Sequence, residues 1–447
     1  EFNMGYNGTE NFAKGKRFGF FPAVSLGWVI SEEKFFPKNN IVKYLKVRGS
    51  YGEVGNDQIG GDRFLYLPSS YGAASDSGVN KYNFGLASNP YTSLMIVENK
   101  IGNPDLTWEK AKKMNVGVDI NLFNNCLTAS FDIFKEKRNN ILANRSTSPM
   151  IIGANLPAYN FGEMENRGWE MDLNFRHHIQ DFHYWARFNY SFARNEIIYM
   201  DEVQKRYDYQ MTTGRRKNQF FGLIFDGYYN SWEEINALDR PKSSWSGNQL
   251  QPGDVKYVDV NQDGVIDDYD MVPIGYTPVP EIIYGFSFGA QYKGFDFSIL
   301  FQGADNVSIK YFGRSMWPFA KGEESAKSLI KERWTQERYE AGEKITFPRL
   351  SLNPNGETDH NYRPSTLWIR DASYLRLKNL EVGYTFTGGF VKRLNLNSVR
   401  LYFNGSNLFT WTDVVDLDPE APSRSGNVEI NTYPLQKVYN IGLNINF

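Results

Sequence analysis

The residues whose types and spacing fit one defined chemistry lie in the segment from Asp259 to Asp270. Side chains that carry oxygen occupy its first, third and fifth positions, glycine the sixth, an apolar residue the eighth and an acid the twelfth. An EF-hand-type calcium loop needs this spacing, because the turn at glycine folds the carboxylates onto one hard cation. The predicted calcium ligands are the carbonyl of Val265 and the side chains of Asp259, Asn261, Asp263, Asp267 and Asp270.

The same segment departs from a complete EF-hand in two ways. Asp270 stands where a glutamate usually binds calcium through both carboxylate oxygens, and the shorter aspartate makes this two-oxygen contact less certain. No helical pattern flanks the loop. A solvated turn of Asp, Asn and Gly is the alternative, but acids this close would repel one another without a counterion. We therefore expect a structural calcium ion that stiffens a surface loop, with no catalytic role.

Other residues capable of chemistry lack the partners that a reaction needs. Ser287 lies in the pattern Gly-Phe-Ser-Phe-Gly of a hydrolase nucleophile elbow, which requires a sharp turn from strand to helix. The apolar period of two continues through the pattern to Tyr292, which predicts an unbroken strand. Cys126 is the single cysteine, so no internal disulfide can form, and none of the four histidines has a metal-ligand spacing. The sequence therefore predicts no enzyme.

Aromatic side chains in the predicted external loops form a second group of binding candidates. They are Tyr228, Tyr229, Trp232, Trp245, Trp317 and Trp411. Aromatic rings present large apolar faces that can stack on a sugar or pack against a peptide. We predict that some of them contact substrate or a partner protein, and anchoring of the loops is the alternative.

The elements that must position these residues are β-strands with one apolar and one mostly polar face. The final stretch, from Gln436 to Phe447, alternates in this way, and the same period of two recurs along the chain. The connections between the predicted strands differ in length. The short ones are 31–40, 123–125, 176–181, 293–294 and 387–395. The long ones are 9–16, 53–106, 139–161, 195–279, 303–370 and 409–431.

Short and long connections follow one another in strict alternation if 195–279 is a single excursion, and this predicts twelve membrane-spanning strands. Bacterial barrels have short periplasmic turns and long extracellular loops, whereas a soluble sandwich has no reason to sort its loops. The strand-like piece 217–228 must then belong to the long loop, and it could fold into the lumen of the barrel. A slip of the apolar phase between Leu377 and Leu380 predicts a β-bulge.

Composition agrees with an all-β, antiparallel transmembrane barrel. Aromatic residues make up 16% of the 447 residues, and the 39 glycines suit twisted strands and turns. The mean hydropathy is −0.51, and no apolar run approaches the roughly 18 residues that a membrane helix needs. A barrel stays possible because every second residue faces the lumen and can be polar. The net charge of −2 gives no polycationic surface for nucleic acid.

The strand from Tyr374 to Tyr384, with the sequence YLRLKNLEVGY, resembles a strand of SusC/RagA-type TonB-dependent transporters of Bacteroidetes. Further stretches match the same family in its order along the chain. They are Phe21-Pro22, Ser25-Leu26-Gly27-Trp28, Ile30-Ser31-Glu32-Glu33, Leu45-Lys46-Val47-Arg48-Gly49-Ser50-Tyr51-Gly52, Gly55-Asn56, Asn103-Pro104-Asp105-Leu106-Thr107-Trp108-Glu109, Asn407-Leu408-Phe409-Thr410, Asp418-Pro419-Glu420, Tyr433-Pro434 and Gly442-Leu443-Asn444.

This resemblance implies the C-terminal part of a roughly 22-stranded barrel embedded in outer-membrane lipid. It also implies that the plug, the TonB box and about ten strands lie upstream, and a start at Glu1 without a signal peptide agrees with a fragment. Members of the family import oligosaccharides or peptides with energy from TonB. A SusD-like surface lipoprotein usually covers their extracellular loops.

Two other architectures remain open at this stage. One is a free-standing twelve-stranded barrel, acting as a passive porin or as a membrane enzyme such as a phospholipase. The other is a soluble, calcium-stabilised β-protein that binds carbohydrate. Extraction without detergent is expected only for the soluble protein.

Overall fold

The structure is a computed structural model of the 447-residue chain. It describes residues 1–58, 60, 63–67, 72–73, 81–86, 91–94, 96–97, 101–147, 156–245, 250–311, 317–319, 328–351, 359–420, 427–428 and 435–447. No helix in these ranges is both long enough and apolar enough to cross a membrane.

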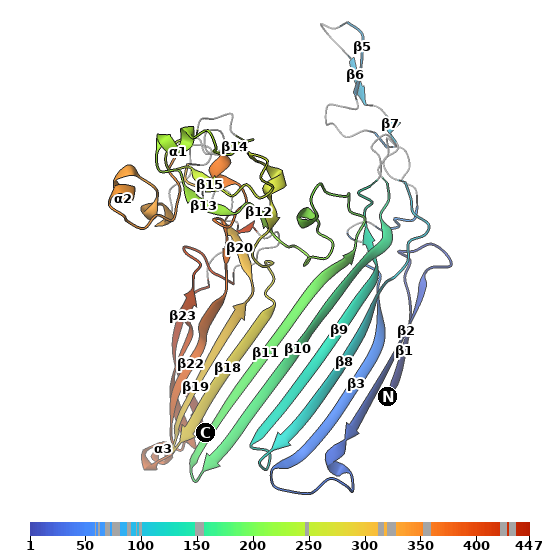
Figure 1. Cartoon of the computed structure of the whole chain (residues 1–447). Coiled ribbons are helices and arrows are strands. Elements are labelled where there is room, and N and C mark those ends of the chain that lie inside the picture. Colours follow the sequence, from blue (N-terminus) through green and yellow to red (C-terminus); the bar gives the residue numbers. More distant parts are fainter. Residues whose placement is uncertain are drawn as a thin grey trace.

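One antiparallel sheet of twelve strands dominates the molecule, and each strand pairs with the next large strand along the chain. Figure 1 shows these strands side by side as a tilted, curved wall. The predicted number of spanning strands is therefore confirmed. The strands are β1 (Phe2–Gly8), β2 (Phe18–Val29), β3 (Val42–Asn56), β8 (Glu109–Leu122), β9 (Leu127–Ala143), β10 (Tyr159–Ile179), β11 (Phe182–Tyr199), β18 (Ile282–Tyr292), β19 (Phe295–Asp305), β22 (Tyr374–Phe386), β23 (Ser398–Thr412) and β25 (Val438–Asn446).

The two faces of this wall differ in chemistry because side chains alternate along each strand. On the outer face, large apolar side chains stay exposed, and Ile441 reaches 81% exposure. Other exposed members are Leu26, Trp28, Val116, Ile133, Phe288 and Leu443. So large an apolar surface is unfavourable in water and is the surface that a membrane barrel presents to lipid. The inner face carries the charged and amide side chains described below.

Tight turns close the wall at one end, as predicted. Phe123, Asn124 and Asn125 all have positive φ angles, 52°, 56° and 67°, in the turn between β8 and β9. The β18–β19 turn uses Lys293 and Gly294, and a Cβ atom on Gly294 would lie 2.6 Å from the carbonyl oxygen of Thr385. Glycine fits this turn because it has no Cβ atom and adopts positive φ without strain. Two short helices lie at the same type of connection: η1 (Ile30–Glu32) and α3 (Gly389–Arg393).

The predicted β-bulge in β22 is confirmed. Its pairing with β23 shifts register between Leu377 and Asn379, and its pairing with β19 shifts between Leu300 and Phe301. Several strands are longer than predicted: β3 continues to Asn56, β9 to Ala143 and β23 to Thr412.

The long connections at the other end fold into a domain with its own hydrophobic core. Figure 1 shows it beyond the ends of β18, β19, β22 and β23. We call the described residues of 221–280 and 306–372, together with Val414, the loop domain. Its buried core is formed by Leu223, Tyr228, Val255, Tyr257, Ile266, Val307, Ile309, Tyr311, Leu329, Trp334, Phe347, Tyr362, Leu367, Trp368, Ala372 and Val414. The predicted strand-like piece 217–228 therefore packs in this core at the loop end of the wall.

Small elements support the loop domain. Its strands are β12 (Phe221–Gly222), β13 (Phe225–Tyr228), β14 (Lys242–Ser243), β15 (Val255–Tyr257), β16 (Val265–Ile266), β17 (Val272–Pro273), β20 (Ser308–Tyr311) and β21 (Ile369–Asp371), and β24 (Asn427–Val428) pairs with β20. Its helices are α1 (Trp232–Asn236), η4 (Asp268–Asp270), η7 (Ser328–Glu332), α2 (Gln336–Glu340) and η8 (Asp359–Tyr362), while η3 (Asp208–Gln210) precedes it.

The connection 53–106, predicted as a loop without strands, contains short pairs in its described part. They are β4 (Gly72–Ala73) with β7 (Ile96–Val97), and β5 (Lys81–Phe84) with β6 (Tyr91–Leu94). In Figure 1 the β5–β6 hairpin projects beyond the loop end of the wall.

Candidate functional site

The segment 259–270 folds into the turn that its spacing predicts. Gly264 has a φ angle of 82°, which lets the chain reverse at the sixth position. One carboxylate oxygen of Asp259 accepts the amide of Gln262 at 2.7 Å, and the other accepts the amide of Gly264 at 2.8 Å. Asp263 accepts the amide of Val265 at 3.0 Å. The backbone of the segment therefore has the closed form that a calcium loop requires.

The carboxylate of Asp270 closes this loop through hydrogen bonds to the backbone. Its side chain is fully buried, and its oxygens accept the amides of Val260 and Asp267 at 2.8 and 2.9 Å. Burial and the charge of Asp259 raise the pKa of Asp270 above its usual value, against the effect of these hydrogen bonds. Among the described residues, which include all of 259–270, no three His, Cys, Asp or Glu side chains are arranged to hold a metal ion. The backbone turn forms as the spacing predicts, while the carboxylates of this segment do not converge on one point.

The six aromatic candidates occupy three kinds of position. Tyr228 and Tyr229 are buried, and Trp245 and Trp317 are partly buried against the loop-domain core. Trp232 is 51% exposed at the start of α1. The prediction that Trp411 lies in an external loop is wrong, because β23 extends through it. Its ring lies on the outer face beside Phe301 and Phe409, so it faces away from the lumen.

Tyr374, Arg376 and Lys378 of β22 form a buried charge cluster with the loop that follows β23. Arg376 is 2% exposed, and its guanidinium donates to Asp418 and Glu420 at 2.6 Å each. Tyr374 and Lys378 also donate to Glu420, at 2.8 and 3.2 Å. Although burial acts in the opposite direction, hydrogen bonds from Arg376 and the backbone hold the pKa of Asp418 below its usual value. The cluster fixes the loop after β23 against β22.

On the inner face, two arginines reach acids across a glycine of the intervening strand. Arg48 of β3 passes over Gly117 of β8 and contacts Asp132 of β9 at 2.5 Å. A Cβ atom on Gly117 would lie 2.6 Å from the Asp132 carboxylate and 2.7 Å from the Arg48 guanidinium. Arg400 reaches Asp296 across Gly383 in the same way. A Cβ atom at either glycine would force the arginine or the carboxylate to shift, and the bridges link strands that do not pair directly.

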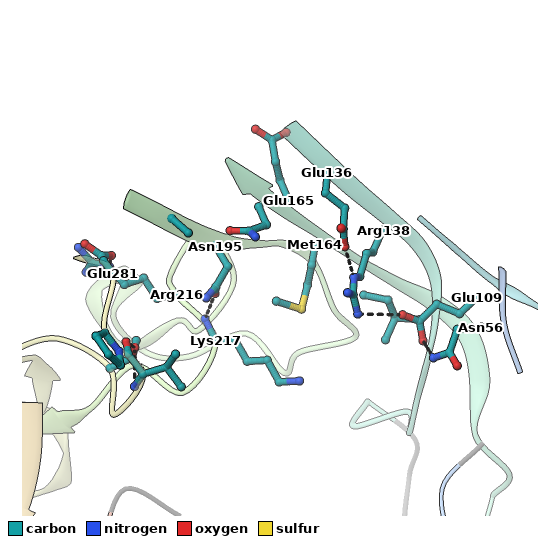
Figure 2. A pocket seen from close by; sticks show the side chains of 16 residues that line it. Asn56, Glu109, Glu136, Arg138, Met164, Glu165, Asn195, Arg216, Lys217 and Glu281 are labelled. Atoms are coloured by element: carbon teal, nitrogen blue, oxygen red, sulfur yellow. Dashed lines mark hydrogen bonds and ion pairs between the residues drawn. The ribbon is translucent and has the colours of Figure 1, made fainter. Parts of the chain in front are cut away.

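A cavity of about 410 Å³ opens on the inner face near the loop end of β8–β11, and sequence reasoning missed it. It is drawn in Figure 2. Side chains of both charges line it, with Met164 and Ile141 as apolar members. The charged members are Glu109, Glu136, Arg138, Glu165, Arg216, Lys217 and Glu281. These residues come from strands and loops far apart in the sequence, so no local motif marks the cavity.

Most charges in this cavity are paired. Arg138 contacts Glu136 and lies 3.6 Å from Glu109, while Arg216 contacts Glu281. The ammonium of Lys217 forms no ion pair with any described residue. Figure 2 shows its side chain extending through the space between the Arg216 side and the Arg138 side. The cavity therefore offers one uncommitted cation between two groups of acids, and no aromatic ring is among its described lining residues.

The polar network of the loop domain joins its two long connections. Asp254 accepts from Arg349 at 2.6 Å and from Asn361 at 2.8 Å. His360 is buried, with one ring nitrogen 2.7 Å from the carbonyl oxygen of Val255 and the other 2.8 Å from the Ser243 hydroxyl. Burial lowers the pKa of His360. Neutral His360 donates through Nε2 and accepts through Nδ1, which satisfies both partners.

Ser287 lies in the middle of β18, which runs without interruption from Ile282 to Tyr292. The predicted unbroken strand is confirmed, and the residue is not on a strand-to-helix turn.

Comparisons with known proteins agree with this architecture. A family model described as TonB dependent receptor-like, beta-barrel matches residues 2–408. TonB-dependent receptor P3 of Formosa agariphila is 28% identical over 460 residues, covering 99% of this chain and 43% of that protein. TonB-dependent receptor SusC of Bacteroides thetaiotaomicron is 27% identical over 452 residues, covering 100% of this chain and 42% of that protein.

A structure of the RagAB peptide transporter has a similar fold, with a TM-score of 0.73 at 24% sequence identity. The match covers 100% of this chain and 45% of that one. The chain thus spans less than half the length of the relatives that it matches. With an all-β wall that exposes its apolar face and a SusC-like sequence throughout, this chain belongs to the TonB-dependent receptor-like β-barrel family of outer-membrane transporters.

Proposed function

We propose that this chain forms part of the wall and the extracellular cover of an active importer of oligopeptides. The proposal includes energy from TonB, acting through a plug that other parts of the protein supply, and a SusD-like lipoprotein on the loop domain. The long connections would then lie outside the cell, because bacterial barrels place their long loops there. Membership of the transporter family supports import in general.

The observation that carries the choice of peptide is the charge of the inner cavity. The ammonium of Lys217, which forms no ion pair with a described residue, matches the carboxylate terminus of a peptide, while the acids of the cavity are already paired with arginine or lysine. An oligosaccharide has no charged ends and usually stacks on aromatic rings, and no aromatic ring is among the described lining residues of the cavity. Oligosaccharide import, which is also common in SusC/RagA-type transporters, is the second candidate.

Uptake by cells that carry the whole transporter tests this choice. We expect Lys217→Gln to reduce uptake of a labelled oligopeptide by up to about fivefold, because a contact made by an exposed charge contributes about 0.2–1 kcal/mol. Lys205→Gln is the matched control, since Lys205 is exposed and lies outside the cavity. Unchanged peptide uptake in Lys217→Gln, or competition by neutral oligosaccharides, would count against a peptide cargo.

We also propose that the segment 259–270 binds calcium in a structural role. The closed turn at Gly264, the spacing of its oxygen ligands and the buried carboxylate of Asp270 support this proposal. We expect added calcium to raise the melting temperature of the loop domain. The Asp263→Asn variant should need at least ten times more calcium for the same rise in melting temperature. Asp239→Asn, in the neighbouring loop, should respond like the parent. An equal response in Asp263→Asn would contradict calcium binding here.

A further inference from the structure

The outer face of β10 and β11 changes from aromatic to basic toward the loop end. Trp169 stacks on Tyr190 with ring centroids 4.7 Å apart, and Phe192 is the direct partner of Trp169 across the strands. Two residues further on the same face come Arg167 and Arg194, which also pair directly. Transmembrane barrels carry girdles of aromatic side chains at both membrane interfaces, and Phe192, level with Trp169, lies toward the loop end of β11. The arginines therefore lie at or just outside the membrane interface.

These arginines line a cavity of about 410 Å³ between the two strands and the loop that follows β11. Arg215 and Arg216 of that loop line it as well, and Glu196 is the acidic member. The loop is held beside β11 because the amide of Ile197 donates to the carbonyl oxygen of Arg215 at 2.8 Å. Four arginine guanidinium groups therefore line this one cavity.

Only two of these four arginines have an acidic partner. Glu281 receives two hydrogen bonds from Arg194, at 2.9 and 2.8 Å, and also contacts Arg216. Within the described part of the chain, Arg167 and Arg215 form no ion pair, with Glu196 or with any other acid. Like charges held together are unfavourable unless an anion joins them. The cavity therefore has the charge of an anion site.

Phosphate fits this arrangement by chemistry and by position. The planar guanidinium forks of arginine match phosphate oxygens, and basic pockets at membrane surfaces bind lipid headgroups. The other face of the strands carries Asn166 and Asn195, and Asn195 also lines this cavity at its edge. On the outer face β9 adds Lys135, which lies opposite Arg167 and 2.9 Å from Glu165, whereas on the other side Ile282 and Asp305 lie at the level of Phe192.

We propose that Arg167 and Arg215 bind the phosphate of a lipid headgroup in the outer leaflet, with Arg194 and Arg216 completing the positive wall of the site. The acyl chains of the same lipid would lie along Trp169, Tyr190 and Phe192. The site is independent of the nature of the cargo. A lipid bound there would hold the outer face of β10 and β11 at the membrane surface, next to the loop that follows β11.

Native mass spectrometry of the whole transporter in detergent tests the site, with a phosphatidic acid as the probe and the diacylglycerol of the same chains as its phosphate-free counterpart. We expect binding of phosphatidic acid and none of diacylglycerol. The double variant Arg167→Gln with Arg215→Gln should bind phosphatidic acid at least tenfold more weakly. Arg187→Gln, which removes a lumen-facing arginine of β11, should bind it like the parent.

Three results would overturn the proposal. They are equal binding by the double variant and the parent, an equal loss in Arg187→Gln, and displacement of phosphatidic acid by inorganic phosphate at the same concentration. The last result would mean that the cavity holds a soluble anion instead of a lipid. Unchanged heat-modifiable migration in electrophoresis shows that each variant barrel is folded.

Discussion

At the scale of single residues, the inner wall depends on glycines that allow arginine side chains to cross a strand. Arg48 and Asp132 approach each other over Gly117, and Arg400 and Asp296 over Gly383. Each bridge joins strands that are two apart in the sheet, which hydrogen bonds between neighbouring strands cannot do. These clusters therefore add lateral stiffness to the wall while keeping charge on the lumen side.

Gly117→Ala should destabilise the barrel by about 1–3 kcal/mol, the usual effect of forcing extra volume into a packed site. The added methyl group would meet both Arg48 and Asp132 at less than 3 Å, so one of them must move. The measurement is the denaturant midpoint of the whole transporter. Gly389→Ala is the control, since a Cβ atom there meets nothing within 4 Å. Equal midpoints for both variants would show that the crossing is not tightly packed.

His360 predicts a pH dependence of the loop domain. Burial lowers its pKa below the ordinary value of about 6.5, so the unfolded state takes up a proton first as the pH falls. The histidine therefore contributes stability above pH 6.5 that is lost as the pH falls toward its folded pKa, by at most about 1.4 kcal/mol per pH unit. Hydrogen exchange at the backbone amides of Val255 and Ser243, followed between pH 7.5 and 5, measures this loss of stability. His360→Gln should remove this dependence, and a dependence that persists would assign it to other groups.

At the scale of elements, the loop domain behaves as a small folded unit attached to the wall. Trp368 is 1% exposed, packs on Tyr362 and Phe347, and donates through its ring nitrogen to the carbonyl oxygen of Asn361 at 2.7 Å. The core that surrounds it comes from both long connections. Loss of this core should therefore release both connections together and leave the strands paired.

Trp368→Ala should destabilise the loop domain by about 3–5 kcal/mol, as expected for a buried tryptophan. Limited proteolysis should then cut within 221–280 and 306–372, while the barrel keeps its heat-modifiable migration. Trp232→Ala is the matched control, because Trp232 is half exposed on α1. Barrel unfolding in Trp368→Ala would show that wall and loop domain are one cooperative unit.

The twelve strands were predictable because their signal is local. A period of two along Met114–Leu122 or Phe295–Phe301 depends only on neighbouring residues, and the bulge near Leu377 appears as a phase slip in one segment. The loop domain was not predictable, since Leu223, Tyr311 and Trp368 meet only in three dimensions. Likewise the turn at Gly264 is local, whereas the inner cavity joins residues from Asn56 to Glu281. Trp411 was misplaced because apolar periodicity does not mark where a strand leaves the membrane.

At the scale of the whole molecule, the chain combines a lipid-facing wall, a charged inner cavity and a folded cover over the loop end. In the twelve-stranded sheet, β1 and β25 are the first and the last strand. Relatives more than twice as long leave room for the further strands and the plug that active import requires.

The dependence of uptake on TonB tests active import most directly. Cells that express the whole transporter would be given a labelled oligopeptide, with and without functional TonB. We predict that uptake falls to background without TonB, although the transporter remains in the outer membrane in equal amounts. Uptake that continues unchanged without TonB would contradict active import and identify a passive channel.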